Sequence, residues 1–555
     1  MKTTSIDGNL LKIMLESAAL MLEENKEEVN SLNVFPVPDG DTGTNMLLTI
    51  KSALKQGLQV DENNASKVAL AASQGSLMGA RGNSGVILSQ LFRGLASGIG
   101  ENEKIDSRIM AEALKRAADT AYKAVMKPTE GTILTVAREC GERAMEIYDL
   151  HEDLADLMEG VIKHGNDVLK KTPDMLPVLK QAGVVDAGGK GLIYIFSGAL
   201  QALKGETVVT VPRIDKISPI KEAPKRREYI ETDDIKFGYC TEFMINTING
   251  DAESFRDELA IFGDSLLVVG GEGLIKVHVH TNNPGQVLEK ALLIGELSDI
   301  KIDNMRYQHE EVLLKDELNL IRDNPEVGQN IEKTIEKQKY SVIAISVGEG
   351  IDRLFKDLNV DVLVPGGQTM NPSTEDIISA INKTNGDHVI ILPNNSNIIL
   401  AAQQAKTLSD RSIIVIPTKT IPQGIAALLA MDPEKDPEYN VDIMSEAIKN
   451  VITGQVTFAV RDTEFNGTEI SKGDIIGLSD KDILSAGTDI NEVSKKLIDK
   501  LMDEDMSIIT LMYGDDISEE TANELADLLT ESYPDIDIEV IHGGQPLYYY
   551  IFAIE

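Results

Sequence analysis

The spacing of apolar residues changes along the chain, and this change limits the possible folds more than any other feature of the sequence. In the first 205 residues, apolar side chains recur every three or four positions, as in Met14, Leu15 and Ala18, which is the pattern of amphipathic helices. Beyond residue 336, short uninterrupted apolar runs alternate with helix-like stretches, which is typical of buried parallel strands covered by helices. These runs lie at 340–347, 361–364, 388–392 and 412–416. The sequence therefore predicts an all-α segment and, later, an α/β segment.

The residues between these two segments follow a third pattern. Residues 206–235 contain three prolines and a run of three basic residues at 225–227, which is typical of a linker or an extended edge. Two apolar runs at 265–269 and 274–280 predict strands, and we expect a further strand at 243–248 and a helix at 284–297. This segment is therefore predicted to be a small α+β domain. The three predicted domains span residues 1–205, 206–335 and 336–555.

The chain is strongly acidic. It has 555 residues, with 53 Lys and Arg against 90 Asp and Glu, which gives a net charge of −37. This charge argues against nucleic acid and against an anionic membrane surface as partners. An anionic substrate would require local cations such as bound Mg²⁺. With two cysteines, a polar N-terminus and no apolar run of 18 residues, we expect a cytoplasmic protein without a disulfide framework, a signal peptide or a membrane span.

The most specific motif is the acidic, glycine-containing loop at 33–45, with the sequence NVFPVPDGDTGTN. Asp39 and Asp41 flank a glycine, so that both carboxylates can converge on one side of a turn. Mg²⁺ prefers oxygen ligands and usually takes one or two carboxylates together with phosphate oxygens. Residues 42–44 offer hydroxyl and N–H groups at the expected start of a helix, a favourable place for phosphate. The alternative is an ordinary Asp-Gly turn that caps a helix.

A second glycine-rich loop, at 79–85, precedes the next helical run. Its small residues would let backbone N–H groups approach a phosphate, and Arg81 would add positive charge. The loop lacks the Gly-Lys-Ser/Thr ending of a P-loop, and it does not follow a strand, which excludes the dinucleotide-binding fingerprint. Taken alone, it is more typical of a turn between two helices.

Four motifs occur in a fixed order, namely PDGDTG at 38–43, GNSG at 82–85, PTEGT at 128–132 and VDAGG at 185–189. Together they resemble the nucleotide-binding domain of dihydroxyacetone kinase, and the whole chain is similar to the A subunits of bacterial fatty acid kinases. This resemblance implies an all-α barrel of eight helices that holds ATP through two Mg²⁺ ions. It also implies a middle α+β domain and a DegV-like α/β region that serves assembly or partner docking.

The resemblance further implies roles for individual residues. Asp39 and Asp41 would be the catalytic, Mg²⁺-binding carboxylates. Asn33 would stand near the position where dihydroxyacetone kinases have a third Asp. The residues that would contact the nucleotide are Thr42, Gly43, Thr44, Asn45, Gly82, Asn83, Ser84, Gly85, Thr132 and Asp186.

The activity that the resemblance implies is ATP-dependent phosphorylation of a fatty-acid carboxylate, which gives an acyl phosphate for phospholipid synthesis. A carboxyl group has a pKa of about 4 and is ionised at neutral pH, so that this acceptor needs no general base. Members of the family receive the fatty acid from a separate fatty-acid-binding protein. We therefore expect such a partner here, and a homodimer of this chain as the commonest arrangement of soluble oligomers.

Two other functions stay open at this point. A dihydroxyacetone-type kinase would act on a small carbonyl compound through a His, for which His388 and His542 are the C-terminal choices. A lipid- or nucleotide-sensing scaffold would bind without turnover.

The middle segment combines Cys240 with three of the seven histidines of the chain, His278, His280 and His309. Residues 278 and 280 are two positions apart on a predicted strand, so that their side chains point to the same face. Zn²⁺ accepts thiolate and imidazole ligands together. We predict a zinc site from these residues, with a half-buried His pair beside an inert Cys as the alternative.

Overall fold

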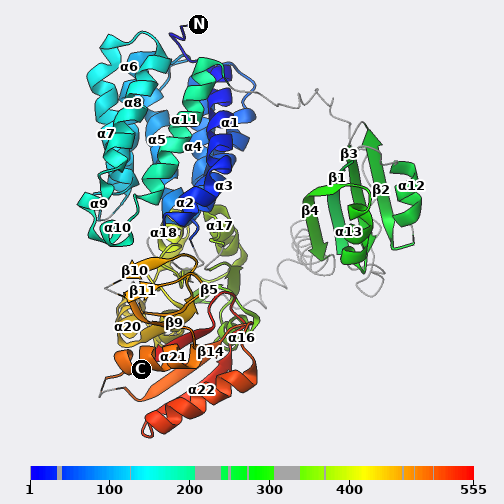
Figure 1. Cartoon of the computed structure of the whole chain (residues 1–555), viewed down its shortest axis with the longest axis vertical. Helices are drawn as coiled ribbons and strands as arrows, with labels where there is room; N and C mark the ends of the chain where they lie inside the picture. Colours follow the sequence, from blue (N-terminus) through cyan, green and yellow to red (C-terminus); the bar gives the residue numbers. More distant parts are fainter. Residues whose placement is uncertain are drawn as a thin grey trace, which may run out of the picture. The chain divides into compact units, whose positions relative to one another are not determined.

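The chain forms two compact units, of which one contains residues Met1–Thr210 and Lys337–Glu555 and the other residues Val211–Glu336 (Figure 1). The computed structural model describes residues 2–33, 40–125, 127–206, 239–247, 252–259, 261–271, 274–304, 338–367, 370–465, 468–479, 482–503 and 506–555. The predicted linker at 206–235 lies almost entirely outside these residues. The predicted domain boundaries at 205 and 335 stay predictions.

The helical segment is a closed ring of helices. Its long helices are α1 (Gly8–Glu24), α3 (Thr42–Leu58), α4 (Ala65–Met78), α5 (Gly82–Ile99), α6 (Ser107–Ala124), α7 (Ile133–Ile147), α8 (Leu154–Leu169) and α11 (Ala187–Lys204). Each of these packs against the next one, and α11 returns to α1. Short helices connect them, namely α2 (Lys26–Ser31), η1 (Tyr148–Leu150), α9 (Thr172–Met175) and α10 (Pro177–Ala182). The all-α barrel expected from the sequence is therefore confirmed for the described residues.

Small residues let neighbouring helices of the ring approach closely. A Cβ atom at Gly94 of α5 would lie 2.5 Å from the carbonyl oxygen of Arg116 on α6, and one at Gly98 would lie 2.5 Å from the Cα of Ala113. Since such distances are far below van der Waals contact, only glycine fits at these positions. The alanines and glycines on the apolar faces of the helices therefore determine how closely neighbouring helices pack.

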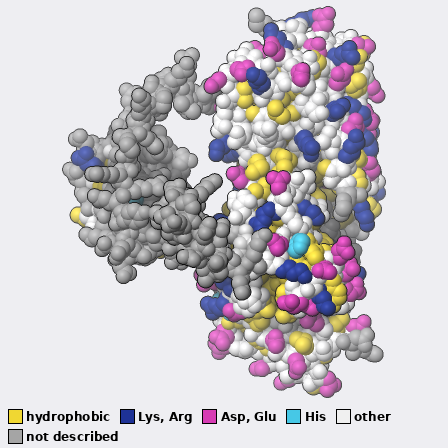
Figure 2. Space-filling model, turned by 180° about the vertical axis from the view of Figure 1, so that it is seen from behind, with side chains coloured by type: hydrophobic (Ala, Val, Ile, Leu, Met, Phe, Trp, Pro, Cys, Tyr) yellow, Lys and Arg dark blue, Asp and Glu magenta, His cyan; other side chains and the backbone are white. Residues whose placement is uncertain are grey.

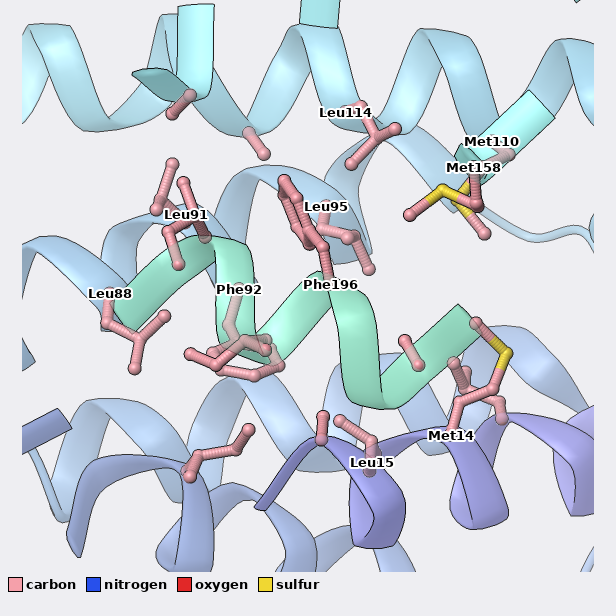
Figure 3. A pocket seen from close by; sticks show the side chains of 18 of the residues that line it. Met14, Leu15, Leu88, Leu91, Phe92, Leu95, Met110, Leu114, Met158 and Phe196 are labelled. Atoms are coloured by element: carbon pink, nitrogen blue, oxygen red, sulfur yellow. The ribbon is translucent and has the colours of Figure 1, made fainter. Parts of the chain in front are cut away.

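The axis of the barrel is apolar (Figure 3). Side chains from opposite sides of the ring, including Leu15, Leu91, Leu114 and Phe196, surround a cavity of about 100 Å³, and all the residues that line it are apolar. The polar chemistry of this domain therefore has to lie at the ends of the barrel.

Four helices, α3, α5, α7 and α11, begin at the same end of the barrel. Near the start of α11, Gly191 lies against Met46 of α3, and Gly188 lies against Ile133 of α7. Gly85 of α5 lies against Thr49 of α3. Each of these four helix starts presents backbone N–H groups and the positive end of a helix dipole, which can receive an anion locally.

The middle unit is a four-stranded antiparallel sheet with strand order β2-β3-β1-β4. Its elements are β1 (Tyr239–Asn246), α12 (Ala252–Leu259), β2 (Gly263–Gly271), β3 (Leu274–Thr281), α13 (Pro284–Leu292) and β4 (Glu296–Asn304). The predicted strands at 265–269 and 274–280 are confirmed. The predicted helix at 284–297 is too long, because α13 ends at Leu292 and the last residues already belong to β4, which the sequence interpretation missed.

The C-terminal segment begins with a parallel sheet of strand order β6-β5-β7-β8. Its strands are β5 (Tyr340–Ser346), β6 (Val362–Pro365), β7 (His388–Leu392) and β8 (Ser412–Val415), so that all four predicted strands are confirmed. The helices that accompany it are α16 (Glu349–Asp357), α17 (Thr374–Lys383), α18 (Ile399–Leu408), α19 (Ile421–Ala430) and α20 (Pro437–Asn450).

A second, mixed sheet completes this segment, with strand order β13-β12-β9-β16-β14-β15. Its strands are β9 (Ile452–Phe458), β12 (Ile475–Ser479), β13 (Asp482–Gly487), β14 (Ile508–Tyr513), β15 (Asp537–His542) and β16 (Tyr550–Ile554). The other elements are the hairpin β10 (Thr463–Phe465) and β11 (Thr468–Ile470), and helices α21 (Ile490–Leu501) and α22 (Glu519–Ser532). The predicted α/β class of the C-terminal region is confirmed.

Charged side chains of both signs cover the surface. Figure 2 shows acidic and basic side chains interspersed over the visible face of the unit that contains the barrel and the C-terminal segment. Among the described residues, no helix has both the length and the apolar character needed to cross a bilayer.

Candidate nucleotide and metal site

Asp41 stands directly before α3, at the end of the barrel where α3, α5, α7 and α11 begin. The residue is buried, with 8% of its surface exposed. It occupies the N-cap position, yet its side chain makes no capping hydrogen bond to α3. By contrast, Asp7 and Asp106 do cap α1 and α6 with their carboxylates. The sequence alternative of an ordinary Asp cap is therefore wrong for Asp41, and its carboxylate is used for something else.

Asn30 of α2 caps α3 in place of Asp41. Its Oδ1 atom accepts hydrogen bonds from the N–H groups of Gly43, at 2.8 Å, and Thr44, at 3.2 Å, and its Nδ2 donates to the Thr44 hydroxyl. The Thr42 hydroxyl donates to Oδ1 of Asn33 at 2.8 Å. Residues 42–44 are thus held by two asparagines, and their contact with phosphate stays a prediction.

The structure also places Asn33 at this loop. A Cβ atom at Gly40 would lie 2.9 Å from Nδ2 of Asn33, so that the Asn33 side chain lies against the turn that leads to Asp41. Asp39 belongs to residues 34–39, which lie outside the described residues. Its role as the second carboxylate therefore stays a prediction.

The two glycine-rich loops meet. Gly82 has a positive φ of 57°, and a Cβ atom there would lie 2.4 Å from Nδ2 of Asn45 on α3 and 3.2 Å from Nδ2 of Asn371. Asn45 is itself buried, with 3% of its surface exposed. Two loops that are far apart in the sequence therefore come together around Asp41 and Asn45.

A third segment completes this region, and the sequence interpretation missed it. Asn371, in the loop between β6 and α17, donates a hydrogen bond from Nδ2 to Oδ2 of Asp41. The same Nδ2 lies 3.4 Å from Oδ1 of Asn45. Because 330 residues separate Asn371 from Asp41, no local sequence pattern could have indicated this contact.

Arg81 of the barrel binds the loop between β6 and α17. Its guanidinium donates to the carbonyl oxygen of Asn371 at 2.7 Å and lies 3.3 Å from the carboxylate of Asp376 on α17. The N–H group of Thr374 donates to the carbonyl oxygen of Ala80 at 3.1 Å. The sequence interpretation assigned the positive charge of Arg81 to phosphate binding. In the structure, the Arg81 guanidinium contacts the C-terminal domain.

Other polar contacts join the same two domains. Asn83 Nδ2 lies within hydrogen-bond distance of the carbonyl oxygen of Ser396, at 3.4 Å, and of Oδ1 of Asn397, at 3.3 Å. Gln404 Nε2 on α18 donates to the carbonyl oxygen of Leu77 at 2.6 Å. Figure 1 shows α17 and α18 at the end of the barrel where α3 begins. The barrel end therefore docks on the carboxyl edge of the parallel sheet.

Arg461 adds a cation to this region. Its guanidinium donates to the carbonyl oxygens of Ser31 and, at 2.6 Å, of Asn33. Burial lowers the pKa of Arg461 from its ordinary value, but an arginine remains charged at neutral pH. The end of α2 and Asn33 are therefore held by a positively charged side chain of the C-terminal domain.

Thr132 and Asp186 begin α7 and α11, at the same end of the barrel as Asp41. Each caps its helix, and Oδ2 of Asp186 accepts the N–H of Gly189 at 2.6 Å. Burial raises the pKa of Asp186 to about 6, although hydrogen bonds from the N–H groups of Gly189 and Ile133 partly oppose the rise. Both residues therefore have a structural role, and their contact with a nucleotide stays a prediction.

The raised pKa of Asp186 gives the fold a pH dependence. Since the folded state favours the protonated carboxyl, its contribution to stability is complete below about pH 4. This contribution is lost as the pH rises through about 6. We expect the metal-free protein to lose on the order of 2 kcal/mol relative to an Asp186→Asn variant between pH 4 and pH 7. Urea unfolding of both proteins across this range measures the difference, and a constant difference would contradict the assignment.

In the middle unit, the backbone register brings Cys240 opposite His280 and Glu242 opposite His278 on the paired strands β1 and β3. His309 lies outside the described residues. Among the residues that the structure describes, no group of three His, Cys, Asp or Glu side chains is arranged to hold a metal ion, and the zinc site stays a prediction.

Three known domain families match successive parts of the chain, in the order of its helical, middle and C-terminal segments. Residues 36–201 match the DAK2 domain, residues 236–312 match the middle domain of the FakA-like proteins, and residues 341–555 match their C-terminal domain. The chain is 45% identical to Protein YloV of Bacillus subtilis over 564 aligned positions, which cover 100% of both chains. The chain belongs to the FakA-like family of fatty acid kinase proteins. The resemblance inferred from the four loop motifs is thereby confirmed.

Other members of this family are equally similar over their whole length. An uncharacterized protein of Staphylococcus epidermidis is 44% identical over 557 positions, again with 100% of both chains covered. Among solved structures, a fatty-acid-binding DegV family protein of Thermus thermophilus matches 39% of this chain and 99% of its own, with 13% identity and a TM-score of 0.31. The dihydroxyacetone kinase of C. freundii matches 40% of this chain and 49% of its own, with 15% identity and a TM-score of 0.28.

Proposed function

We propose that this protein is an ATP-dependent kinase that transfers a phosphoryl group to the carboxylate of a fatty acid held by a separate fatty-acid-binding protein. The product is an acyl phosphate, which feeds phospholipid synthesis. The proposal rests on the family together with one observation. The buried carboxylate of Asp41 is not used to cap its own helix, and α3, α5, α7 and α11 all begin at this end of the barrel.

The residues at this end of the barrel fit a hydrated Mg²⁺ ion that carries a triphosphate. The side chains of Asp41, Asn45, Asn33 and Asn371 supply carboxylate and amide oxygens, which are the ligands that Mg²⁺ prefers. In our proposal Asp41 holds the metal together with Asp39, and the N-terminus of α5 receives the phosphates. The bound metal neutralises charge on the transferred phosphoryl group.

A fatty-acid carboxylate suits a site of this composition as the acceptor. The region contains amides, hydroxyls and carboxylates, and an ionised carboxylate attacks without losing a proton. Of the two histidines considered for a dihydroxyacetone-type mechanism, His388 lies at the opposite edge of the parallel sheet, whereas His542 lies beside the loop that follows β5. His388 begins β7 at the amino end of the parallel sheet, and His542 ends β15 in the second sheet. The barrel, by contrast, docks on the carboxyl edge.

The test is a reconstituted ATP-consumption assay with the full chain. Oleate or palmitate is supplied with and without a DegV-type fatty-acid-binding protein, and dihydroxyacetone is supplied in a separate reaction. We expect ATP consumption only when both the fatty acid and its binding protein are present. Turnover with dihydroxyacetone alone would contradict the proposal, and so would binding of ATP without turnover in any mixture. Light scattering of the same preparation tests the expected homodimer, which should have about twice the 60.5 kDa mass of the chain.

Zinc in the middle domain is a separate part of the proposal. The register of β1 and β3 supports it, because Cys240 is paired with His280, and thiolate and imidazole together suit Zn²⁺. We expect elemental analysis of the purified protein to give about one zinc per chain, and a Cys240→Ser variant to lose it. The matched control is Cys140→Ser, since Cys140 is a buried thiol of the helical barrel. Equal zinc contents in the two variants would contradict the site.

A further inference from the structure

Asn371 is a residue of the C-terminal domain that contacts Asp41 and Asn45 in the candidate site. It is almost fully buried, with 1% of its surface exposed, and its Nδ2 atom donates to Oδ2 of Asp41. An amide that donates to a carboxylate fixes the orientation of that carboxylate, as groups behind a metal ligand commonly do. Asn371 is therefore placed to orient Asp41.

The backbone around Asn371 is held from both sides. Its carbonyl oxygen accepts a hydrogen bond from Arg81 at 2.7 Å. Two residues later, Ser373 and Asp376 form a capping box at the start of α17. These contacts fix the position of the Asn371 side chain before any ligand binds, as preorganised sites require.

The other polar atom of this side chain, Oδ1, has no hydrogen-bond partner among the described residues. A buried oxygen acceptor without a partner is unfavourable, and native proteins usually pair such atoms. The unpaired oxygen belongs to the same amide group whose nitrogen contacts Asp41. It is therefore available to a ligand that also engages the Asp41 carboxylate.

We propose that Asn371 belongs to the magnesium–nucleotide site, and that the C-terminal domain thus supplies one residue of the site built on the helical barrel. Its Nδ2 orients the Asp41 carboxylate, and its Oδ1 accepts from a metal-bound water or coordinates the divalent cation. A neutral amide oxygen suits this place, because a further carboxylate beside Asp41 would repel it when no cation is bound. The inference rests on the proposed function, since it assumes that the metal and nucleotide bind at Asp41.

The test measures how strongly Mg²⁺ promotes nucleotide binding to the full-length protein. Calorimetry gives the dissociation constant of ATP with excess Mg²⁺ and with EDTA, and the ratio of the two isolates the metal. We expect Asn371→Ala to reduce this ratio about tenfold, as is usual for residues that orient a metal ligand. The ratio requires no turnover and no fatty acid.

Gln404→Ala is the matched control. Gln404 is a buried amide in the same contact between the two domains, and it donates to the carbonyl oxygen of Leu77 at 2.6 Å. None of its hydrogen bonds reaches Asp41. If Asn371 only joined the domains, the two variants would change the ratio equally. An unchanged ratio in Asn371→Ala, or an equal reduction in Gln404→Ala, would overturn the inference.

Asn371→Asp provides a second readout that does not depend on nucleotide. The two adjacent carboxylates should lower the melting temperature in EDTA, and Mg²⁺ should restore it by a larger shift than in the unchanged protein. A variant whose melting temperature responds to Mg²⁺ no more than that of the unchanged protein would overturn the inference. If the unchanged protein shows no Mg²⁺-dependent binding of ATP at all, the proposed function fails, and the inference fails with it.

Discussion

An Asp41→Asn variant is expected to lose at least about a thousandfold in ATP-dependent phosphorylation while it keeps its fold, because a bound metal contributes several kcal/mol to phosphoryl transfer. The substitution conserves the shape of a buried side chain that does not cap α3. It removes the negative charge and replaces one acceptor oxygen of the carboxylate, which accepts from Asn371, by an amide nitrogen. Initial rates in the reconstituted assay, together with the Mg²⁺-dependent affinity for ATP, measure the effect. Circular dichroism checks the fold.

Asp7→Asn is the control for the loss of a buried or capping aspartate in the same domain. Asp7 caps α1 by accepting the N–H of Leu10 at 2.9 Å, and α1 and α3 begin at opposite ends of the barrel. Since asparagine caps a helix about as well as aspartate, its substitution is expected to change stability little and to leave the affinity for Mg²⁺ and ATP unchanged. Kinase activity in Asp41→Asn close to that of Asp7→Asn would contradict the metal site.

Gly82→Ala is expected to disrupt the contact between the two glycine-rich loops. The new Cβ would lie 2.4 Å from Nδ2 of Asn45 and 3.2 Å from Nδ2 of Asn371, so that both amides must move. We expect at least about a hundredfold loss of activity, since misplacement of positioning groups by an ångström has effects of this size. The affinity for Mg²⁺ and ATP should fall at the same time.

Gly100→Ala isolates the cost of the backbone conformation. Gly100 follows the other end of α5 with a nearly identical φ of 60°, but a Cβ atom there would meet nothing within 4 Å. Alanine at a positive φ is strained at both positions, by at least about 1 kcal/mol. Gly100, with a ψ of −131°, is no less strained than a left-handed residue, so that a larger loss in Gly82→Ala reports the close contacts. If the two variants lose the same stability and the same activity, the close approach at Gly82 has no functional meaning.

Much of the fold could be predicted because its signals are local. Strands β5 and β7 are buried along nearly their whole length, and this requirement leaves a visible apolar run. Strand β4 was missed because Leu293, Ile294 and Leu297 continue the helical spacing of α13. Gly295, which separates that helix from the strand, was the available signal.

The candidate site was predicted only as far as its motifs are contiguous. The loops around Asp41 and Gly82 are recognisable because each concentrates small and acidic residues in a short stretch. Asn30 contacts Gly43, which is 13 residues away in the sequence, and Asn371 contacts Asp41, which is 330 residues away. A single asparagine has no periodicity, and its partner is fixed by tertiary packing. Long-range polar contacts of this kind therefore escape an interpretation based on spacing.

The docking of the barrel on the carboxyl edge of the parallel sheet has a thermodynamic consequence. Residues of both domains surround Asp41, so that the separation of the domains and the occupancy of the site are linked equilibria. Linkage is reciprocal. If nucleotide binds at Asp41 as proposed, any molecule that binds the C-terminal domain and weakens or strengthens its contact with the barrel must change the affinity for nucleotide. Nucleotide must then change the affinity for that molecule by the same factor.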